Sequence, residues 1–419
     1  MIKKIKNIVN TDDKKRLLSN FFSLSILQAF TYILPLLTLP YLVRVLGAET
    51  FGLVMFAQAF IMFFNVLVDY GFSLSATREI SVHRNDIDKI TEIFSSVMII
   101  KIGLIVISFV LLSIIVFSFE KFSVNWELYY LTFLWVIGQA LFPIWYFQGM
   151  EKMKYITIVN IVSKLIFTAL IFIVIQDESD YIYVPLVNGI GFLVGGLISL
   201  WIIHKQFAQS FKFYNFIILK KYFYDSSQFF LSRVSVSIYT SSNAFVLGLL
   251  TNNTMVGYYS IAEKLYMALQ SFYTPIVQAL YPYVAKEKNV KLFKKIFTLV
   301  VIINTLGIIF LFFTGGYIFD ILFTSSIGSE SIQVFHIFLL AALVIVPSIM
   351  IGYPYLAALG FPRYANMSVV IASIFHILGL GVLVLLDSIT IYSVASLVVM
   401  TQFVDLSYRV YGVKKHNLW

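Results

Sequence analysis

The chain has 419 residues, of which 60% are hydrophobic and only 12% are charged, with a net charge of +9. A water-soluble protein of this length needs far more charged surface, so the composition excludes a soluble globular protein and indicates that lipid surrounds most of the chain. The absence of cysteine excludes disulfides, thiolate metal sites and cysteine nucleophiles.

Apolar stretches follow one another along the whole chain. The first 20 residues, MIKKIKNIVNTDDKKRLLSN, are charged and lack a small-residue cleavage site, so we expect them to form a retained cytoplasmic tail. A bilayer is crossed by about 20 mostly apolar residues. Stretches of this kind predict twelve membrane spans, with these approximate bounds: 19–43, 52–72, 92–118, 128–148, 155–175, 182–203, 226–250, 258–280, 293–315, 333–357, 365–386 and 389–410.

Lysine and arginine are distributed unevenly over the predicted connections. With alternating sides, 24 of the 30 lie on the side of the N-terminus, two (Arg44 and Lys121) on the other side, and four within spans. Because positively charged loops stay in the cytoplasm, both termini are predicted to be cytoplasmic. Topology therefore explains the positive charge without nucleic-acid binding. The segment PYLVRVLGAETFG, residues 40–52, then becomes a tight external turn between the first two spans.

The longest connection, residues 204–225, mixes aromatic residues with lysine, which predicts an amphipathic helix along the inner interface. It separates an N-terminal six-helix bundle, 1–203, from a C-terminal six-helix bundle, 226–419. Gly52 and Gly257, 205 residues apart, each follow a polar turn and precede an alanine by five residues. This similarity fits either an internal repeat, which is common in secondary transporters, or a chance match of one segment pair.

Motifs for catalysis and metal binding are missing from the sequence. It contains no GxxxxGK[ST] phosphate loop and no HExxH pattern, and no Ser-His-Asp order stands out. His336 and His376 are isolated, so we expect hydrogen-bonded structural histidines, and we expect a structural role for Asp405 as well. We therefore predict no enzyme, no metal and no cofactor.

Three basic residues lie deep in the inward half of their predicted spans: Lys101, Lys164 and Arg233. A charge at this depth usually faces a cavity or a partner. For any single residue, snorkelling or a structural ion pair is an alternative explanation. Together, the three residues predict a shared cationic cavity that suits a phosphate-type anion.

Helical spacing supports this hypothesis for two spans. Lys164 shares a helical face with Thr157, Asn160 and Thr168. Arg233 shares a face with three hydroxyl residues, Ser226, Ser237 and Thr240. Hydrogen bonding between helices explains each polar stripe equally well when it is taken alone.

Two acidic residues are candidates for coupling to a proton or cation. Glu263, in the eighth predicted span, lies beside Lys264, and an ion pair with Lys264 or Arg233 is the alternative role. Asp69, near the inner end of the second span, is the other candidate, with an ion pair to Arg78 as its alternative.

Two motifs near the N-terminus carry a family resemblance. PLLTLPYLVRVLGAETFG (35–52) and VDYGFSLSATREISVHRND (68–86) resemble the N-terminal region of Wzx-type O-antigen flippases. These belong to the polysaccharide transporters of the multidrug/oligosaccharidyl-lipid/polysaccharide exporter superfamily. The resemblance implies an all-α integral membrane protein with about 12 transmembrane helices, arranged in two six-helix bundles around a central cavity, as in MATE transporters.

The resemblance also implies a function in the bacterial inner membrane. It implies that undecaprenyl-pyrophosphate-linked oligosaccharide repeat units are flipped from the cytoplasmic to the periplasmic leaflet by alternating access, coupled to an ion. A polysaccharide polymerase and a chain-length regulator are the implied protein partners. The pyrophosphate would be bound by Lys101, Lys164 and Arg233, with Lys264 nearer the outer side. We assign Arg44 and Arg78 to turn geometry and topology first, and to substrate contact second.

The main alternative is a multidrug or metabolite exporter of the same superfamily. An exporter of organic cations favours an acidic, aromatic cavity, whereas the charges within the spans here are mainly basic. A flippase for lipid-linked peptidoglycan precursors would have more spans, and a glycan polymerase or ligase would have a large external loop. O-antigen, capsule and other polymers fit the sequence equally, as do H+ and Na+ as coupling ions.

Overall fold

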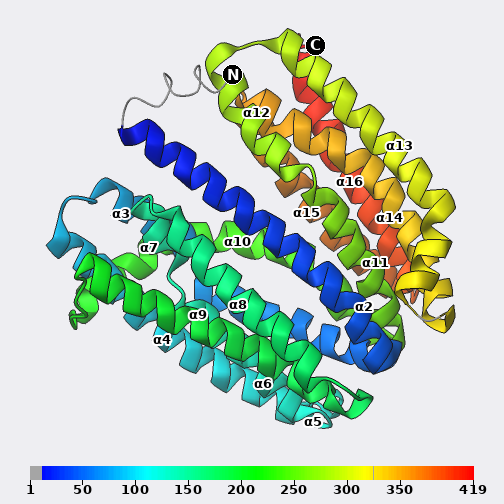
Figure 1. The fold of residues 1–419 in the computed structure, drawn as a ribbon, viewed down its shortest axis with the longest axis horizontal. Coiled ribbons are helices and arrows are strands. Elements are labelled where there is room, and N and C mark those ends of the chain that lie inside the picture. Colours follow the sequence, from blue (N-terminus) through cyan, green and yellow to red (C-terminus); the bar gives the residue numbers. More distant parts are fainter. Residues whose placement is uncertain (1–11, 324) are drawn as a thin grey trace. The chain divides into compact units, whose positions relative to one another are not determined.

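Every secondary-structure element that the structure describes is helical, which confirms the predicted all-α fold (Figure 1). The structure is a computed structural model that describes residues 12–323 and 325–419. Within these ranges, the side chains outside the description are those of residues 12–27, 29, 32–33, 231–233, 235–240 and 325–327. The side chain of Arg233, a predicted binding residue, therefore lies outside the description.

Long apolar helices match most of the predicted spans, but in the described part of the chain 226–250 and 258–280 are not among them, and a turn at Phe272 and Tyr273 interrupts the second of these. In the described part of the chain, nine stretches are long and apolar enough to cross a membrane, and the first of them, Leu34–Val82, includes parts of two predicted spans. The N-terminal elements are α2 (Asp12–Asp69), α3 (Phe72–Val82), α4 (Ile87–Ser118), α5 (Glu120–Ser123), α6 (Trp126–Leu141), α7 (Ile144–Gly149), α8 (Met153–Val174), η1 (Glu178–Ile182) and α9 (Tyr183–Phe207). The C-terminal elements are α10 (Phe216–Leu250), α11 (Asn253–Ser271), α12 (Thr274–Glu287), α13 (Val290–Leu322), α14 (Ser325–Ile351), η2 (Gly352–Ala357), α15 (Pro362–Leu385) and α16 (Ile391–Lys415).

The predicted turn at residues 40–52 is concentrated at one glycine. Helical structure continues on both sides of Gly47, whose φ of 71° and ψ of 174° interrupt α2. This conformation is open to glycine and strained for residues with a side chain. The first two spans therefore occur as the two arms of α2.

The chain divides into two compact units. Unit 1 comprises Met1–Thr38 and Ala57–Val234, and unit 2 comprises Leu39–Phe56 and Ser235–Trp419. The middle of α2 thus packs in unit 2, and the first half of α10 packs in unit 1. The expected interfacial helix is also not a separate element, because residues 208–215 are irregular and α10 continues from Phe216 as one long helix.

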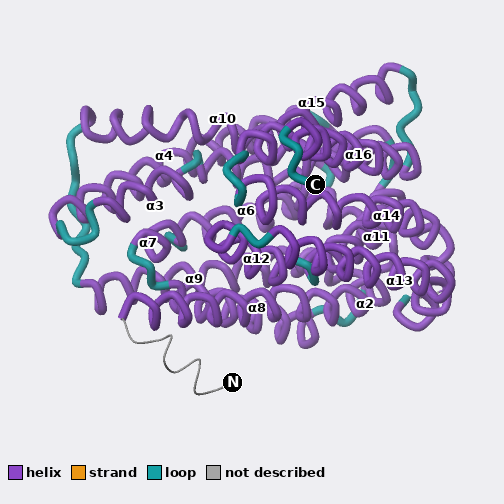
Figure 2. The backbone as a smooth tube through the Cα atoms, turned by 90° about the horizontal axis from the view of Figure 1, so that it is seen from above, coloured by secondary structure: helices purple, strands orange, loops and turns teal. Residues whose placement is uncertain are grey.

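In unit 1, α9 packs against both α6 and α8, and α4 packs against α6. Short loops join these helices (Figure 2). Glycines allow the close approach: a Cβ on Gly138 of α6 would lie 2.6 Å from the backbone of Phe192, and one on Gly191 of α9 would lie 2.7 Å from the carbonyl oxygen of Ser163. Small residues at such contacts are typical of helices packed within membranes.

The VDYGF motif explains why α10 begins in unit 1. The ring of Tyr70 stacks on Phe223 and Phe230 of α10, with centroid distances of 4.2 and 4.6 Å. Gly71 has a φ of 77°, and a Cβ there would lie 2.7 Å from the backbone nitrogen of Phe230. Ser75 of α3 and Ser226 of α10 share a buried hydrogen bond of 2.7 Å. The motif thus anchors the start of α10 to the turn between α2 and α3.

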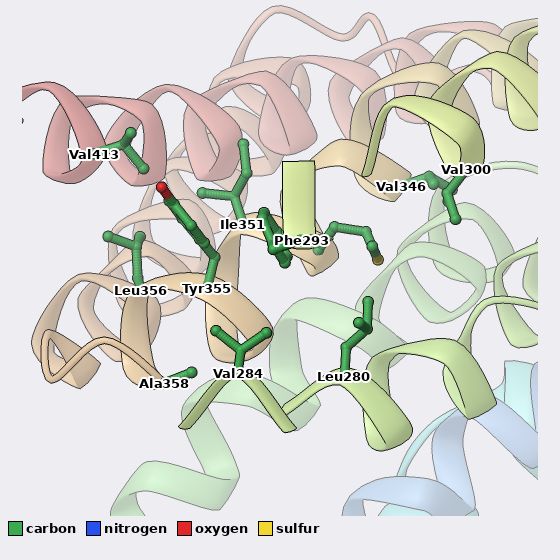
Figure 3. Packing of buried hydrophobic residues seen from close by; sticks show 11 residues of the cluster. Leu280, Val284, Phe293, Val300, Val346, Ile351, Tyr355, Leu356, Ala358 and Val413 are labelled. Carbon is green, nitrogen blue, oxygen red and sulfur yellow. The ribbon is translucent and has the colours of Figure 1, made fainter. Parts of the chain in front are cut away.

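In unit 2, α14 packs against α11, α13 and α16, and α15 packs against α16. Its hydrophobic core gathers around Tyr355 of η2, which stacks on Phe293 of α13 with a centroid distance of 4.4 Å (Figure 3). Val284, Val346 and Val413 bring α12, α14 and α16 to the same cluster. This apolar contact between distant segments holds the second unit together.

Candidate functional site

Lys101 of α4 is the most deeply buried of the predicted binding residues whose side chains the structure describes. Its side chain is 5% exposed, and its ammonium lies 4.0 Å from a carboxylate oxygen of Asp69 at the end of α2. Asp69 also accepts a hydrogen bond of 3.0 Å from Ser73 of α3. A buried ammonium has three N–H donors, and the described side chains offer it only this one long ion pair. Lys101 can therefore accept a further anionic partner.

Asp69 does not form the ion pair with Arg78 that was one predicted alternative. Arg78 is exposed on α3, and the carboxylate of Asp69 faces Lys101 instead. The two residues proposed separately for substrate binding and for ion coupling are thus neighbours. Arg78 is close to Asp69 in the sequence, which suggested an ion pair between the two. The packing of α4 beside the end of α2 makes Lys101 the partner of Asp69 instead.

Lys164 lies half-buried on α8, in a polar stripe of the same unit. The stripe includes Asn160, which donates to the carbonyl of Ile156 at 2.9 Å, and Thr168, whose buried hydroxyl has no hydrogen-bond partner among the described residues. The ammonium of Lys164 likewise has no ion pair in the described part of the chain. Buried polar groups are normally satisfied, so this stripe fits contact with water or a polar ligand.

The other basic candidates are distributed over both units. Arg233 belongs to α10 within unit 1, and its side chain lies outside the described residues. Lys264 is half-buried on α11 of unit 2. A cationic cavity shared by these residues with Lys101 and Lys164 stays a prediction.

Among the described residues, Glu263 of α11 has a hydroxyl as its hydrogen-bond partner. The hydroxyl of Tyr259 donates to its carboxylate at 3.2 Å, and the adjacent Lys264 forms no direct ion pair with it in the described structure. Tyr259 and Tyr266 both pack on Phe338 of α14. The half-buried carboxylate therefore lies on an aromatic surface within unit 2.

Of the two histidines expected to be structural, His336 has a buried Nε2 without a hydrogen-bond partner among the described residues, whereas His376 is hydrogen-bonded through both ring nitrogens. His376 is fully buried, with its ring nitrogens 2.8 Å from the amide oxygen of Asn243 and 2.9 Å from the hydroxyl of Thr401. This confirms the predicted hydrogen-bonded histidine. Among the described residues, no three metal-ligating side chains come together.

Unit 2 contains a buried ionic cluster around Arg409 that the sequence analysis does not predict. Arg409 pairs with Asp405 at 3.2 Å and donates to the hydroxyl of Ser368 and the carbonyl of Ser348, at 2.8 and 2.7 Å. Ser348 in turn donates to Asp405 at 2.6 Å. The i, i+4 spacing of Asp405 and Arg409 was the available signal. The cluster confirms a structural role for Asp405.

Arg44 has the geometric role that we assigned to it first. Its guanidinium donates to the carbonyl of Leu322 at 2.8 Å and to that of Ile321, at the C-terminus of α13. A cation is favourable at this end of a helix because the carbonyl groups there lack helical partners. Arg44 therefore links α2, near its interruption at Gly47, to the C-terminal end of α13 within unit 2.

Arg44→Ala is expected to lower the free energy of unfolding by about 1–2 kcal/mol, because it removes charge-assisted hydrogen bonds and a helix-end charge. Arg44→Lys should have an intermediate effect, since lysine keeps the charge but lacks the forked donor. Thermal unfolding of the detergent-purified protein measures both. Arg78→Ala, at an exposed position, is the control. Equal melting temperatures for Arg44→Ala and wild type would contradict this role.

The chain is similar in sequence to a known protein family and to transporters from two bacteria. Residues 17–288 match the family described as "Polysaccharide biosynthesis protein". The chain is 34% identical over 299 residues to a "Putative O-antigen transporter" of Escherichia coli (strain K12), covering 69% of this chain and 71% of that protein. A protein of the same description from Shigella dysenteriae is 32% identical over 272 residues, or 64% of this chain and 67% of its own length.

Solved structures share the fold at low sequence identity. The lipid II flippase MurJ, in an inward closed conformation, aligns with a TM-score of 0.73 and 14% identity, over 93% of this chain and 87% of its own. An inward-facing multidrug resistance MATE family transporter aligns with a TM-score of 0.68 and 13% identity, over 91% and 94% of the two chains. These likenesses confirm the MATE-like fold class. The sequence matches show that the chain belongs to the polysaccharide biosynthesis protein family.

Proposed function

We propose that this protein is a flippase for undecaprenyl-pyrophosphate-linked oligosaccharide repeat units. It moves them from the cytoplasmic to the periplasmic leaflet of a bacterial inner membrane, with both of its own termini in the cytoplasm. The relatives are transporters, and the chain is accordingly a multi-pass membrane transporter rather than an enzyme. The names of the two curated relatives support an O-antigen repeat unit as the cargo.

The observation that carries this proposal is the buried, incompletely paired ammonium of Lys101. A pyrophosphate offers several charged oxygens, which form stronger hydrogen bonds with an ammonium than neutral acceptors do. Lys164 and Arg233 of the same unit would add further positive charge, and Lys264 would act nearer the outer side. The glycan would cross through the protein while the polyprenyl chain stays in the bilayer.

Asp69 and Glu263 are the proposed coupling groups. Asp69 holds Lys101 in the absence of another anion. When Lys101 binds the pyrophosphate, the carboxylate of Asp69 loses its cation and can take up a proton. Glu263, which accepts a hydrogen bond from Tyr259, can take up a proton or a cation in unit 2. Binding of the anionic cargo and uptake of a coupling ion are thereby linked. A polysaccharide polymerase and a chain-length regulator are the proposed partners that act next.

Replacement of the basic residues tests the proposal. Lys164→Ala and Arg233→Ala should each lower surface polysaccharide about tenfold in a complemented deletion strain, because a lost charge-assisted contact of ~1.4 kcal/mol corresponds to that factor. Expression, measured by immunoblotting of membranes, should stay unchanged. Lys286→Ala is the matched control, since its side chain is 84% exposed. Full activity of the Lys164→Ala/Arg233→Ala double variant would remove both residues from the site.

A further inference from the structure

A pocket of about 350 Å³ lies in unit 1, and none of its lining residues belongs to α8. Three helices form its walls, with apolar side chains from α4 (Phe94, Met98 and Ile102), α6 (Leu141) and α9 (Leu200 and Ile203). Its volume is at the small end of ligand pockets, which span on the order of 300–1,000 Å³. An apolar space of this size suits one hydrocarbon chain.

The surroundings of the pocket belong to the lipid-facing surface. Ile102, in its wall, is 50% exposed. Leu197 and Trp201 on α9 are exposed as well, by 60% and 59%. In a multi-pass membrane protein, exposed apolar side chains of this kind contact lipid tails. The ligand that reaches this pocket most readily is therefore a lipid chain from the bilayer.

The irregular segment 208–215 borders the pocket and supplies Gln209 and Phe211 to its lining. This segment is held in place by Gln209, which bonds to the hydroxyl of Thr91 at 3.2 Å, and by the amide of Lys212, which donates to Ser95 at 3.1 Å. The segment that borders the pocket is thus fixed to α4 by hydrogen bonds.

Two lysines lie next to lining residues of the pocket. Lys205 follows the lining residue His204, and Lys212 follows the lining residue Phe211; both lysines are exposed. The ammonium of Lys212 lies 3.8 Å from Asp88, whose side chain is 96% exposed. An ion pair so open to solvent is weak, so a phosphate group can compete with the carboxylate.

We propose that this pocket binds one acyl chain of an anionic phospholipid. The lipid belongs to the leaflet whose headgroups lie at the level of Lys205 and Lys212, and its phosphate contacts these two lysines. Apolar burial supplies affinity for the chain, and the two lysines supply the preference for an anionic headgroup. The occupant is a bilayer lipid, and its binding does not depend on the transport cargo.

Photolabelling tests this site on the full-length protein in phosphatidylcholine nanodiscs. The probe is phosphatidylglycerol with a diazirine near the end of one acyl chain, and mass spectrometry identifies the labelled peptides. We expect labels on the pocket-lining segments of α4, α6 and α9. Unlabelled phosphatidylglycerol should compete more strongly than added phosphatidylcholine. Stronger competition by undecaprenyl phosphate than by phosphatidylglycerol would overturn the assignment to a bilayer phospholipid.

Matched variants distinguish the pocket from the general lipid surface. Leu200→Trp fills the pocket and should lower labelling about tenfold, whereas Leu197→Trp, at an exposed position on the same helix, should leave it unchanged. Met98→Trp fills the pocket from α4 and provides a second test if Leu200→Trp does not fold. The Lys205→Gln/Lys212→Gln double variant should lose the preference for phosphatidylglycerol. Equal labelling of wild type and both filled variants, or an unchanged headgroup preference, would contradict the proposal.

Discussion

Gly52→Ala is expected to disrupt the packing of unit 2. A Cβ on Gly52 would overlap the carbonyl oxygen of Asn253 and would lie 2.6 Å from the backbone nitrogen of Gly257. A Cβ on Gly257 would likewise overlap the carbonyl oxygen of Ala48. The second arm of α2 and the start of α11 thus touch through their backbones. Because backbone atoms cannot move aside as a side chain does, the two helices must separate, at a cost of about 1–3 kcal/mol or more.

Thermal unfolding in detergent measures this effect, and Gly307→Ala supplies the control. Gly307 is an exposed glycine of α13 in the same unit, and a Cβ there would meet no atom within 4 Å. Alanine should be neutral or stabilising at that position because it has the higher helix propensity. Gly257→Ala should destabilise as Gly52→Ala does. If Gly52→Ala and Gly307→Ala melted alike, the close backbone contact would be wrong.

Arg409→Met should destabilise unit 2 even more strongly. Among the described residues, the variant leaves the buried carboxylate of Asp405 with the hydroxyl of Ser348 as its one partner, and it removes the N–H that donates to Ser368. Breaking one side of a buried ion pair typically costs about 3–5 kcal/mol, because the remaining charge stays desolvated. Arg409 also needs the space at Gly352, where a Cβ would lie 2.7 Å from its guanidinium.

A second substitution separates the charge effect from lost packing. The Arg409→Met/Asp405→Asn double variant removes both charges and should recover part of the stability that Arg409→Met loses. Arg363→Ala, at an exposed position of α15, should change the melting temperature little. A double variant that is less stable than Arg409→Met would show that the ion pair is not the cause.

Hydropathy and charge distribution predicted the helices well, because each span must satisfy its backbone hydrogen bonds internally. The fine structure depended on contacts that a linear pattern does not contain. The predicted turn at residues 40–52 is confined to the non-helical residue Gly47. The expected interfacial helix is irregular over residues 208–215. The beginning of α10 packs in unit 1 because Tyr70 stacks on Phe223 and Phe230, an arrangement that no spacing rule indicates.

The candidate site was predictable in its residue types and less so in its pairings. A lysine within a span indicates a partner or a cavity, and Lys101 proved to have Asp69 beside it. The sequence pattern suggested an ion pair between Asp69 and its near neighbour Arg78. It could not indicate Lys101, because the position of α4 beside the end of α2 is a tertiary feature. The burial of Arg409, at the end of its predicted span, depends on Ser348 of α14 and Ser368 of α15, which its position in the sequence does not indicate.

Deletion of the gene in its host tests the proposed flippase most directly. Surface polysaccharide, the leaflet location of lipid-linked single repeat units, and sensitivity to cationic drugs should be measured in the same cells. The proposal predicts that surface polysaccharide is lost and that single repeat units accumulate on the inner leaflet, with restoration by the wild-type gene. Normal polysaccharide together with heightened sensitivity to cationic drugs would contradict it and would identify a multidrug exporter instead.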